Sequence, residues 1–202
     1  MKIVHVETLI SQGRFAASPE WARIRTDLLA AVRNVEWPPG SGHFTIYPES
    51  GKKRGEGNGV KPIKQGLMLS LERSGWQLEQ PLDLATRTRP GKIDAVLQTS
   101  RGPVAVEWET GNISSSHRAL NKMALGLLHG VLLAGVLIVP SRALYRFLTD
   151  RVGNWPELEP YVGLWRSVPV AEGVLEILVI EHDAVSEDVP RISKGTDGRA
   201  LA

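Results

Sequence analysis

Two segments in the first half of the chain place apolar residues at the spacing of an amphipathic helix. The first follows Ser18, Pro19 and Glu20, which supply a capping hydroxyl, a preset φ and a first-turn acid. It must end before the prolines at 38–39. The second covers about residues 61–75 and ends at a glycine. The two apolar stripes are Trp21, Ile24, Leu28 and Val32, and Ile63, Leu67, Met68 and Leu71.

The second half of the chain adds two more expected helices and a long apolar run. Serines at 114–116 offer caps for a helix over 115–129, and a further helix is expected over 141–152. The 17 residues 124–140 are apolar, but they fall short of the about 20 needed to span a bilayer, and glycines interrupt them. We therefore interpret this run as a buried helix end, a turn and a buried strand at 135–139.

Alternating or β-branched segments predict the strands. Besides 135–139, we expect strands at 76–82, 92–97, 103–110 and 174–180. The order strand, strand, helix, strand, helix is typical of the α/β class with a central mixed β-sheet flanked by helices. We expect a single domain spanning residues 1–202, with a tail that frays from about residue 186.

Composition narrows the possible functions. The chain has 202 residues and no cysteine, which excludes disulfides, thiolate metal sites and cysteine nucleophiles, and the cytoplasm is the expected location. The net charge is only +2, but residues 52–101 contain ten Lys or Arg against five Asp or Glu. Such a local excess of positive charge favours a polyanionic partner.

Three acidic residues occupy two adjacent predicted strands. Side chains alternate along a strand, so Glu107 and Glu109 share one face while Trp108 points to the other. Asp94 is a short turn away on the preceding strand, so the three carboxylates are expected to converge at one end of the sheet. They would repel one another unless a divalent cation such as Mg²⁺ lay between them. The ordinary alternative is an edge strand with a solvated acidic face.

Asp94, followed after twelve intervening residues by Glu107-Trp108-Glu109, resembles the PD-(D/E)xK nuclease superfamily. Glutamate stands where that superfamily usually has lysine. In this departure the chain resembles the BamHI-like type II restriction endonucleases. The resemblance covers roughly residues 57–154. Its further points of agreement are the segments 109–114 and 135–140, Lys122-Met123 and Asp150-Arg151.

The resemblance implies a restriction-endonuclease-like fold and Mg²⁺-dependent hydrolysis of double-stranded DNA, with Mn²⁺ as a substitute ion. Asp94 and Glu107 would bind metal, and Glu109 would bind metal or act as a general base. Such a site also uses an upstream acid, which we assign to Glu79, with Glu72 as the alternative.

DNA contacts follow from the same resemblance. The expected base-reading residues are Asn112, Ser114 and Arg118 at one helix start and Asp150 and Arg151 at the end of the next helix. Arginine presents a fork to guanine, and aspartate accepts from cytosine N4, although each position also has an ordinary role as a turn, cap or helix-end pair. The loop 43–60, expected to stay mobile until an anion orders it, and the helix after it would hold phosphates. The lysines concerned are Lys52, Lys53, Lys61 and Lys64.

A short palindrome as substrate implies a symmetric homodimer, which we place through the helices 115–129 and 141–152. The reading residues imply a G/C-flanked six-base site of the GGATCC kind, and a cognate methyltransferase acting on the same site. Three alternatives remain. They are a repair or structure-specific nuclease of the same fold, a catalytically inactive DNA-binding module, and an interaction domain whose acids are merely solvated.

Overall fold

The computed structural model describes residues 1–53, 55–81, 91–149 and 152–194. Within them, six strands form one sheet in the order β1-β7-β6-β5-β4-β3. Its strands are β1 (Lys2–Gln12), β3 (Gln77–Pro81), β4 (Lys92–Gln98), β5 (Pro103–Trp108), β6 (Ala134–Pro140) and β7 (Gly173–Glu181). β5, β6 and β7 run parallel, whereas β1, β4 and β3 join through antiparallel pairs, so the predicted mixed sheet is confirmed. A small parallel pair is formed by β2 (Thr45–Ile46) and β8 (Ala184–Val185).

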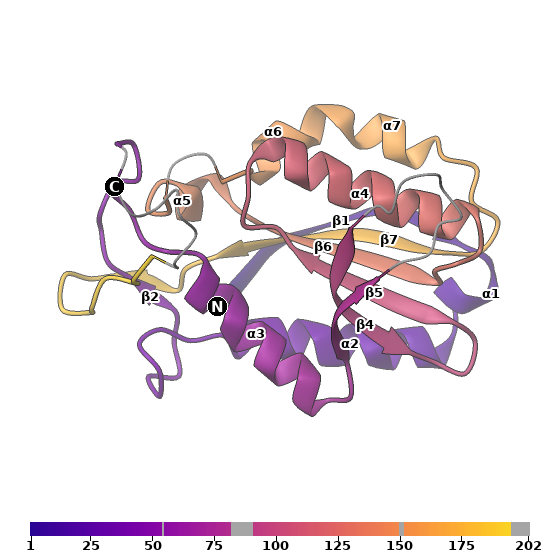
Figure 1. The fold of residues 1–202 in the computed structure, drawn as a ribbon, viewed down its shortest axis with the longest axis horizontal. Coiled ribbons are helices and arrows are strands. Elements are labelled where there is room, and N and C mark those ends of the chain that lie inside the picture. The colour runs from indigo at the N-terminus through magenta and orange to yellow at the C-terminus, as the bar shows by residue number, and fades with distance from the viewer. Residues whose placement is uncertain (54, 82–90, 150–151, 195–202) are drawn as a thin grey trace.

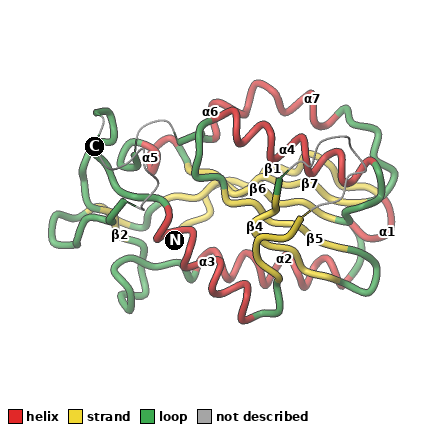
Figure 2. Tube along the Cα trace, viewed as in Figure 1, coloured by secondary structure: helices red, strands yellow, loops and turns green. Residues whose placement is uncertain are grey.

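Helices cover both faces of the sheet (Figure 1). One face carries α2 (Pro19–Arg33) and α3 (Lys61–Arg73). The other carries α4 (Ile113–Leu128), α6 (Trp155–Leu158), a 3₁₀ turn (Glu159–Tyr161) and α7 (Val162–Arg166). The short helices α1 (Gly13–Ala16) and α5 (Arg142–Tyr145) follow β1 and β6. Figure 2 shows the sheet as the middle of three layers, so an α/β sandwich is formed as predicted.

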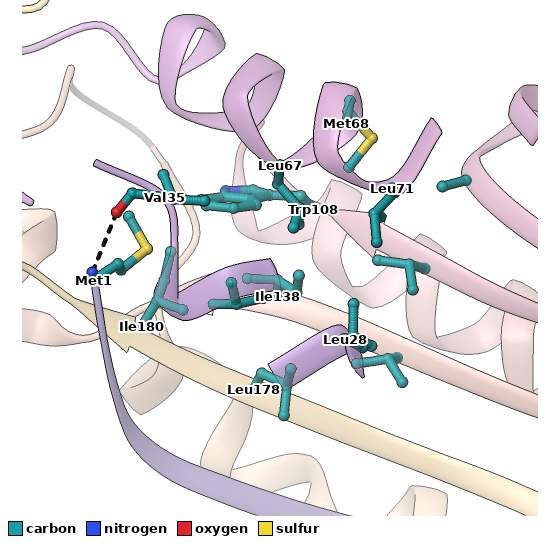
Figure 3. Packing of buried hydrophobic residues seen from close by; sticks show 14 of the residues in the cluster. Met1, Leu28, Val35, Leu67, Met68, Leu71, Trp108, Ile138, Leu178 and Ile180 are labelled. Carbon is teal, nitrogen blue, oxygen red and sulfur yellow. Dashed lines mark hydrogen bonds between the residues drawn. The ribbon is translucent and has the colours of Figure 1, made fainter. Parts of the chain in front are cut away.

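Strand alternation divides the buried residues between two cores. Val104, Val106 and Trp108 join the core beneath α2 and α3, whereas Ala105 joins the core beneath α4. Figure 3 shows Trp108 packed beneath α3 next to Leu67. This alternation directs Glu107 toward the α4 side, as the sequence pattern predicted.

The helix predicted after Ser18, the helix predicted at about 61–75 and the strands predicted at 92–97, 135–139 and 174–180 are confirmed as α2, α3, β4, β6 and β7. Ser18 caps α2 by accepting the Trp21 N–H at 3.1 Å. The apolar run 124–140 forms the end of α4, a turn and β6. In the described part of the chain, none of the helices has the length and hydropathy needed to cross a membrane.

The predicted helix 141–152 is wrong over most of its length. Ser141 caps the helix as expected, accepting the Leu144 N–H at 3.1 Å, but of the described residues in this range only Arg142–Tyr145 form an α-helix. The backbone of 146–149 instead bonds to the preceding loop. Gly51 N–H donates to the Arg146 carbonyl at 3.1 Å, and Asn58 N–H donates to the Phe147 carbonyl at 2.7 Å. Backbone pairing with a distant segment therefore overrides the local apolar spacing.

The same hydrogen bonds correct two further expectations. The loop 43–60 is held by the protein itself, since Asn58 is fully buried and its Oδ1 accepts the Ile192 N–H at 3.0 Å. Ile192 is also fully buried, and Arg191 pairs with Glu49 at 2.6 Å. Arg191 and Ile192 are thus held against the loop, whereas Glu187, Asp188 and Pro190 are exposed, and the frayed tail expected from about residue 186 stays a prediction. Residues 195–202 lie outside the described ranges.

Sequence inspection missed β1, α6 and α7. β1 pairs with β7 over its whole length, from Lys2 opposite Glu181 to Gln12 opposite Gly173. Polar residues such as His5 and Glu7 interrupt its apolar pattern, because its outer face is exposed at the sheet edge.

Candidate active site

Asp94 and Glu107 lie directly across from each other where the β4–β5 ladder ends. The register pairs Ala95 with Val106, and the next position brings Asp94 opposite Glu107. There the side chains replace the backbone as hydrogen-bond acceptors. Trp108 N–H donates to Asp94 Oδ2 at 2.8 Å, and Asp94 N–H donates to Glu107 Oε2 at 3.3 Å. The fold therefore brings these two carboxylates together and fixes both of them.

Two lysines balance the charge of this pair. Lys64 of α3 places its Nζ 2.5 Å from Asp94 Oδ1. Lys122 of α4 pairs with Glu107 Oε1 and donates to the Lys92 carbonyl at 2.7 Å. The side chains of Lys122 and Glu107 are only 7% and 10% exposed. The sequence argument assigned the neutralising charge to a divalent cation alone, whereas the fold already supplies two ammonium groups.

The environment of Glu107 changes its ionisation. Burial is the main cause that raises its pKa to about 7, and the nearby charge of Asp94 raises the pKa further. Lys122 acts in the opposite direction without cancelling these effects. Glu107 therefore gains or loses its proton near neutral pH. Carboxyl groups with such shifted pKa values are concentrated at functional sites.

Glu109 lies just beyond the end of β5, on the same side as Glu107. Its backbone N–H donates to the Ile138 carbonyl at 3.2 Å, so it still follows the parallel ladder. Its Oε1 accepts the Gly111 N–H at 2.7 Å, which turns the carboxylate toward the start of α4. Burial raises the pKa of Glu109, and the Gly111 hydrogen bond partly opposes this effect.

The predicted upstream acids stay apart from this pair. The pairs on either side of Glu79 place it opposite Asp94 in the β3–β4 ladder, but its φ of 54° breaks the extended conformation. Glu79 is exposed, and its carboxylate makes no hydrogen bond or ion pair with any residue that the structure describes. Glu72 is exposed near the end of α3. The structure therefore fixes Asp94 and Glu107 together by hydrogen bonds but shows no such contact for either glutamate among the described residues, and their role as the upstream acid stays a prediction.

The predicted reading residues of α4 lie beside Glu109. Asn112 is the N-cap of α4 and its Oδ1 accepts the Ser115 N–H at 3.2 Å, so the cap is this asparagine and not one of the serines. Asn112, Ser114 and Arg118 are all exposed at this end of the helix. Asp150 and Arg151 lie outside the described residues. Shortly after these two residues the chain lies beside the start of α4, since Gly153 N–H donates to the Gly111 carbonyl at 2.9 Å.

The four lysines predicted to hold phosphates have different settings. Lys52 and Lys53 are exposed in the loop, and Lys61 is exposed in the first turn of α3. Lys64, one turn further along, contacts Asp94. Sequence inspection did not indicate that Lys64 and Lys122 are partners of the acids, because neither lysine is close to them in the chain.

The donor set fits a hard divalent cation. In the ranges that the structure describes, no three His, Asp or Glu side chains are arranged to hold a metal ion. The pair formed by Asp94 and Glu107 nevertheless suits Mg²⁺, which often takes one or two carboxylates and keeps waters and phosphate oxygens as its other ligands. Glu109 lies outside that pair because its carboxylate is bonded to Gly111.

Comparison with solved structures identifies the fold. The chain resembles the restriction endonuclease BglII in its complex with a DNA 16-mer, with a TM-score of 0.61. The match covers 95% of this chain and 88% of that one, at 11% sequence identity. At this identity the likeness concerns the fold alone, which is that of a restriction endonuclease.

Sequence comparison then identifies the family. The family model described as restriction endonuclease BamHI matches residues 1–199. The type II restriction enzyme OkrAI of Oceanobacter kriegii is 48% identical over 201 residues, covering 100% of both chains. The type II restriction enzyme BamHI of Bacillus amyloliquefaciens is 37% identical over 169 residues, covering 80% of this chain and 75% of that one. The chain belongs to the BamHI family of restriction endonucleases, which confirms the resemblance found in the sequence, and it is an enzyme of the type II site-specific deoxyribonuclease class.

Proposed function

We propose that the chain is a Mg²⁺-dependent endonuclease that hydrolyses phosphodiester bonds of double-stranded DNA at a short palindrome. The observation that carries this proposal is the fixed pair of carboxylates formed by Asp94 and Glu107, beside Glu109 at the carboxyl end of a parallel strand. Both hydrophobic cores lie against one sheet, so we also propose a single domain.

Each acidic residue has a distinct task in this proposal. Asp94 and Glu107 would hold the metal, and Lys64 and Lys122 keep these carboxylates in place beforehand. When bound, Mg²⁺ supplies polarisation of the phosphate and neutralisation of the leaving oxygen. Glu109 would take the proton of the attacking water on Oε2, because Oε1 already accepts the Gly111 N–H. The raised pKa of Glu109 makes its carboxylate a better base.

Recognition would use the exposed start of α4. The Asn112 side chain caps the helix through its oxygen, so its amide nitrogen remains available to a base edge. Arg118 is exposed near the same end of α4, where its Nη2 donates to Ser115 Oγ at 3.4 Å, and guanine O6 and N7 are the preferred partners of a guanidinium group. We propose Asn112, Ser114, Arg118, Asp150 and Arg151 as base readers of a GGATCC-like site. A cognate methyltransferase would protect the same site in the cytoplasm, where we propose that the enzyme acts.

A homodimer would match the two-fold symmetry of a palindrome. Of the two helices predicted for this interface, the one at 141–152 is helical in its described residues only at Arg142–Tyr145, so it offers a shorter helical surface than expected. Two leucines on the outer face of α4, Leu125 and Leu128, are 40% and 44% exposed. We propose that α4 supplies the dimer contact through them, and sedimentation of Leu125→Glu against the parent chain tests it.

The nuclease proposal is tested with Asp94→Asn and Glu107→Gln on phage DNA in Mg²⁺ and in Mn²⁺. The parent chain should give discrete fragments, and both variants should lose at least about a hundredfold in rate while still binding DNA in Ca²⁺. Glu159→Gln, an exposed acid far along the chain, is the matched control and should cut normally. Cutting at the parental rate by either variant would exclude the mechanism.

The same assay separates the alternative functions. A smear, or cutting only of branched or damaged DNA, would indicate a repair or structure-specific nuclease. DNA binding with no cutting in either ion would indicate an inactive DNA-binding module. The burial of Glu107 and Glu109, which raises the pKa of both carboxyl groups, argues against the remaining alternative of a merely solvated acidic face.

A further inference from the structure

A basic depression lies next to the loop that precedes α3. It has a volume of about 550 Å³ and is lined by Pro48, Ser50, Gly51, Lys52, Arg142, Tyr145, Arg146, Phe147 and Leu148. Its cations are Lys52, Arg142 and Arg146, and the ring of Tyr145 lies 4.8 Å from the Arg142 guanidinium carbon. Within the described ranges, no carboxylate forms an ion pair with these three cations. We call this depression the flank groove, defined by Lys52, Arg142, Tyr145 and Arg146.

The two walls of the flank groove are fixed to each other. Gly51 N–H donates to the Arg146 carbonyl at 3.1 Å, and Asn58 N–H donates to the Phe147 carbonyl at 2.7 Å. At Gly51 the walls approach so closely that an added Cβ would lie 1.5 Å from the Leu148 carbonyl oxygen. The cations are therefore carried on a preformed base, which reduces the entropic cost of binding an anion.

The flank groove and the candidate active site lie at the same end of the sheet. β6 runs parallel to β5, and α5 follows the carboxyl end of β6 just as Glu109 follows that of β5 (Figure 1). From Leu148 the chain needs only five residues to reach Gly153, a span of at most about 18 Å. Gly153 bonds to Gly111, which bonds to Glu109. The groove thus lies within about 25 Å of Glu109, or roughly seven base pairs of duplex DNA.

We propose that the flank groove binds the phosphodiester backbone of duplex DNA outside the recognition sequence. This inference rests on the proposed nuclease function and adds a second, sequence-independent contact to it. Guanidinium groups form paired hydrogen bonds with phosphate oxygens. The contact strengthens binding without adding sequence information.

The test compares two duplexes of the same central GGATCC sequence, with two or twelve flanking base pairs on each side. Binding is measured by fluorescence anisotropy in Ca²⁺ over a range of NaCl concentrations. The double variant Arg142→Ala and Arg146→Ala should bind the long duplex at least about tenfold more weakly than the parent chain does. The slope of log K against log salt should fall by about two, or about 0.9 for each phosphate that the variant no longer neutralises. On the short duplex, the double variant and the parent chain should agree.

The matched control is the double variant Arg33→Ala and Arg73→Ala, which removes two other exposed arginines from the last turns of α2 and α3. Its affinity for either duplex should equal that of the parent chain. Equal losses on both duplexes, or no loss on the long one, would overturn the proposal. If the double variant does not fold, Lys52→Ala gives the same comparison with an expected slope change of about one. Failure of the parent chain to bind or cut either duplex would instead contradict the proposed GGATCC-like site, and failure to cut phage DNA as well would remove the nuclease function itself.

Discussion

Lys122 and Glu107 form a buried ion pair that joins α4 to β5, and the same ammonium group also bonds the Lys92 carbonyl at the start of β4. One side chain thus fixes a carboxylate and the strand opposite to it. Because α4 also carries the exposed start with Asn112 and Arg118, the helix that we propose as the DNA reader is attached directly to the candidate metal site.

Replacement of Lys122 by Met should destabilise the chain by about 3–5 kcal/mol at pH 8, because it leaves a buried carboxylate without its cation. At pH 5.5 the loss of stability should be much smaller, since Glu107 is then protonated in both the parent and the variant. Urea unfolding at the two pH values measures both effects. The double variant with Glu107→Gln should recover most of the stability at pH 8, and an equal loss at both pH values would contradict this account.

The raised pKa of Glu107 predicts how stability depends on pH in the absence of metal. The folded chain holds this proton more tightly than the unfolded chain, whose glutamate has an ordinary pKa near 4.5. Stability contributed by Glu107 is therefore present below pH 4.5 and is lost as the pH rises to about 7. Subtracting the free energy of unfolding of Glu107→Gln from that of the parent chain at each pH isolates the contribution of Glu107. A difference that is flat between these pH values, or that rises, would contradict the prediction.

Gly111 should be intolerant of a side chain although it is not in a strained conformation. An added Cβ would lie 2.9 Å from Glu109 Oε1 and 3.1 Å from Ser115 Oγ, so Gly111→Ala should displace the proposed base. We expect cleavage to slow by about a hundredfold, with the melting temperature nearly unchanged. Gly163→Ala is the control, because nothing lies within 4 Å of its added Cβ. Normal cleavage by Gly111→Ala would exclude this role for Glu109.

Arg25 lies away from the candidate active site and should contribute to the stability of the fold. It bonds both carboxylate oxygens of Glu176, at 3.1 and 2.9 Å, and that glutamate side chain is only 5% exposed. Arg25→Met should therefore cost about 3–5 kcal/mol in the free energy of unfolding. Arg23, on the same helix and paired with Asp27 at 3.8 Å, is 70% exposed, so Arg23→Met should change stability by less than about 0.5 kcal/mol. Similar effects of the two substitutions would refute the distinction between buried and exposed pairs here.

Much of the sheet and one half of the site could be predicted from short-range patterns. Alternation along β5 gives the facing of Glu107, and the short connection to β4 brings Asp94 next to it. The partners of these acids could not be predicted in the same way. Lys64 and Lys122 come from helices on opposite faces of the sheet, so their approach depends on how α3 and α4 pack and not on any spacing in the chain.

Long-range pairing also explains the errors in secondary structure. β1 becomes a strand by pairing with β7, about 170 residues away, and its own alternation is irregular because of two register shifts. The segment after Tyr145 has the apolar spacing of a helix, but the carbonyls of Arg146 and Phe147 accept hydrogen bonds from the loop at 51–58. Local propensity predicts neither outcome, since both depend on a distant backbone.

The ladder of β4 and β5 ends in two amides that bond to carboxylates and not to carbonyls, those of Asp94 and Trp108. Their exchange with deuterated solvent depends on the charge and position of the acids themselves. Binding of an ion to the acids withdraws electron density from both hydrogen bonds, whereas opening of the hairpin releases both amides together. The molecule therefore contains its own spectroscopic reporters, two backbone hydrogens whose signals distinguish an occupied centre from an opened one without an attached probe.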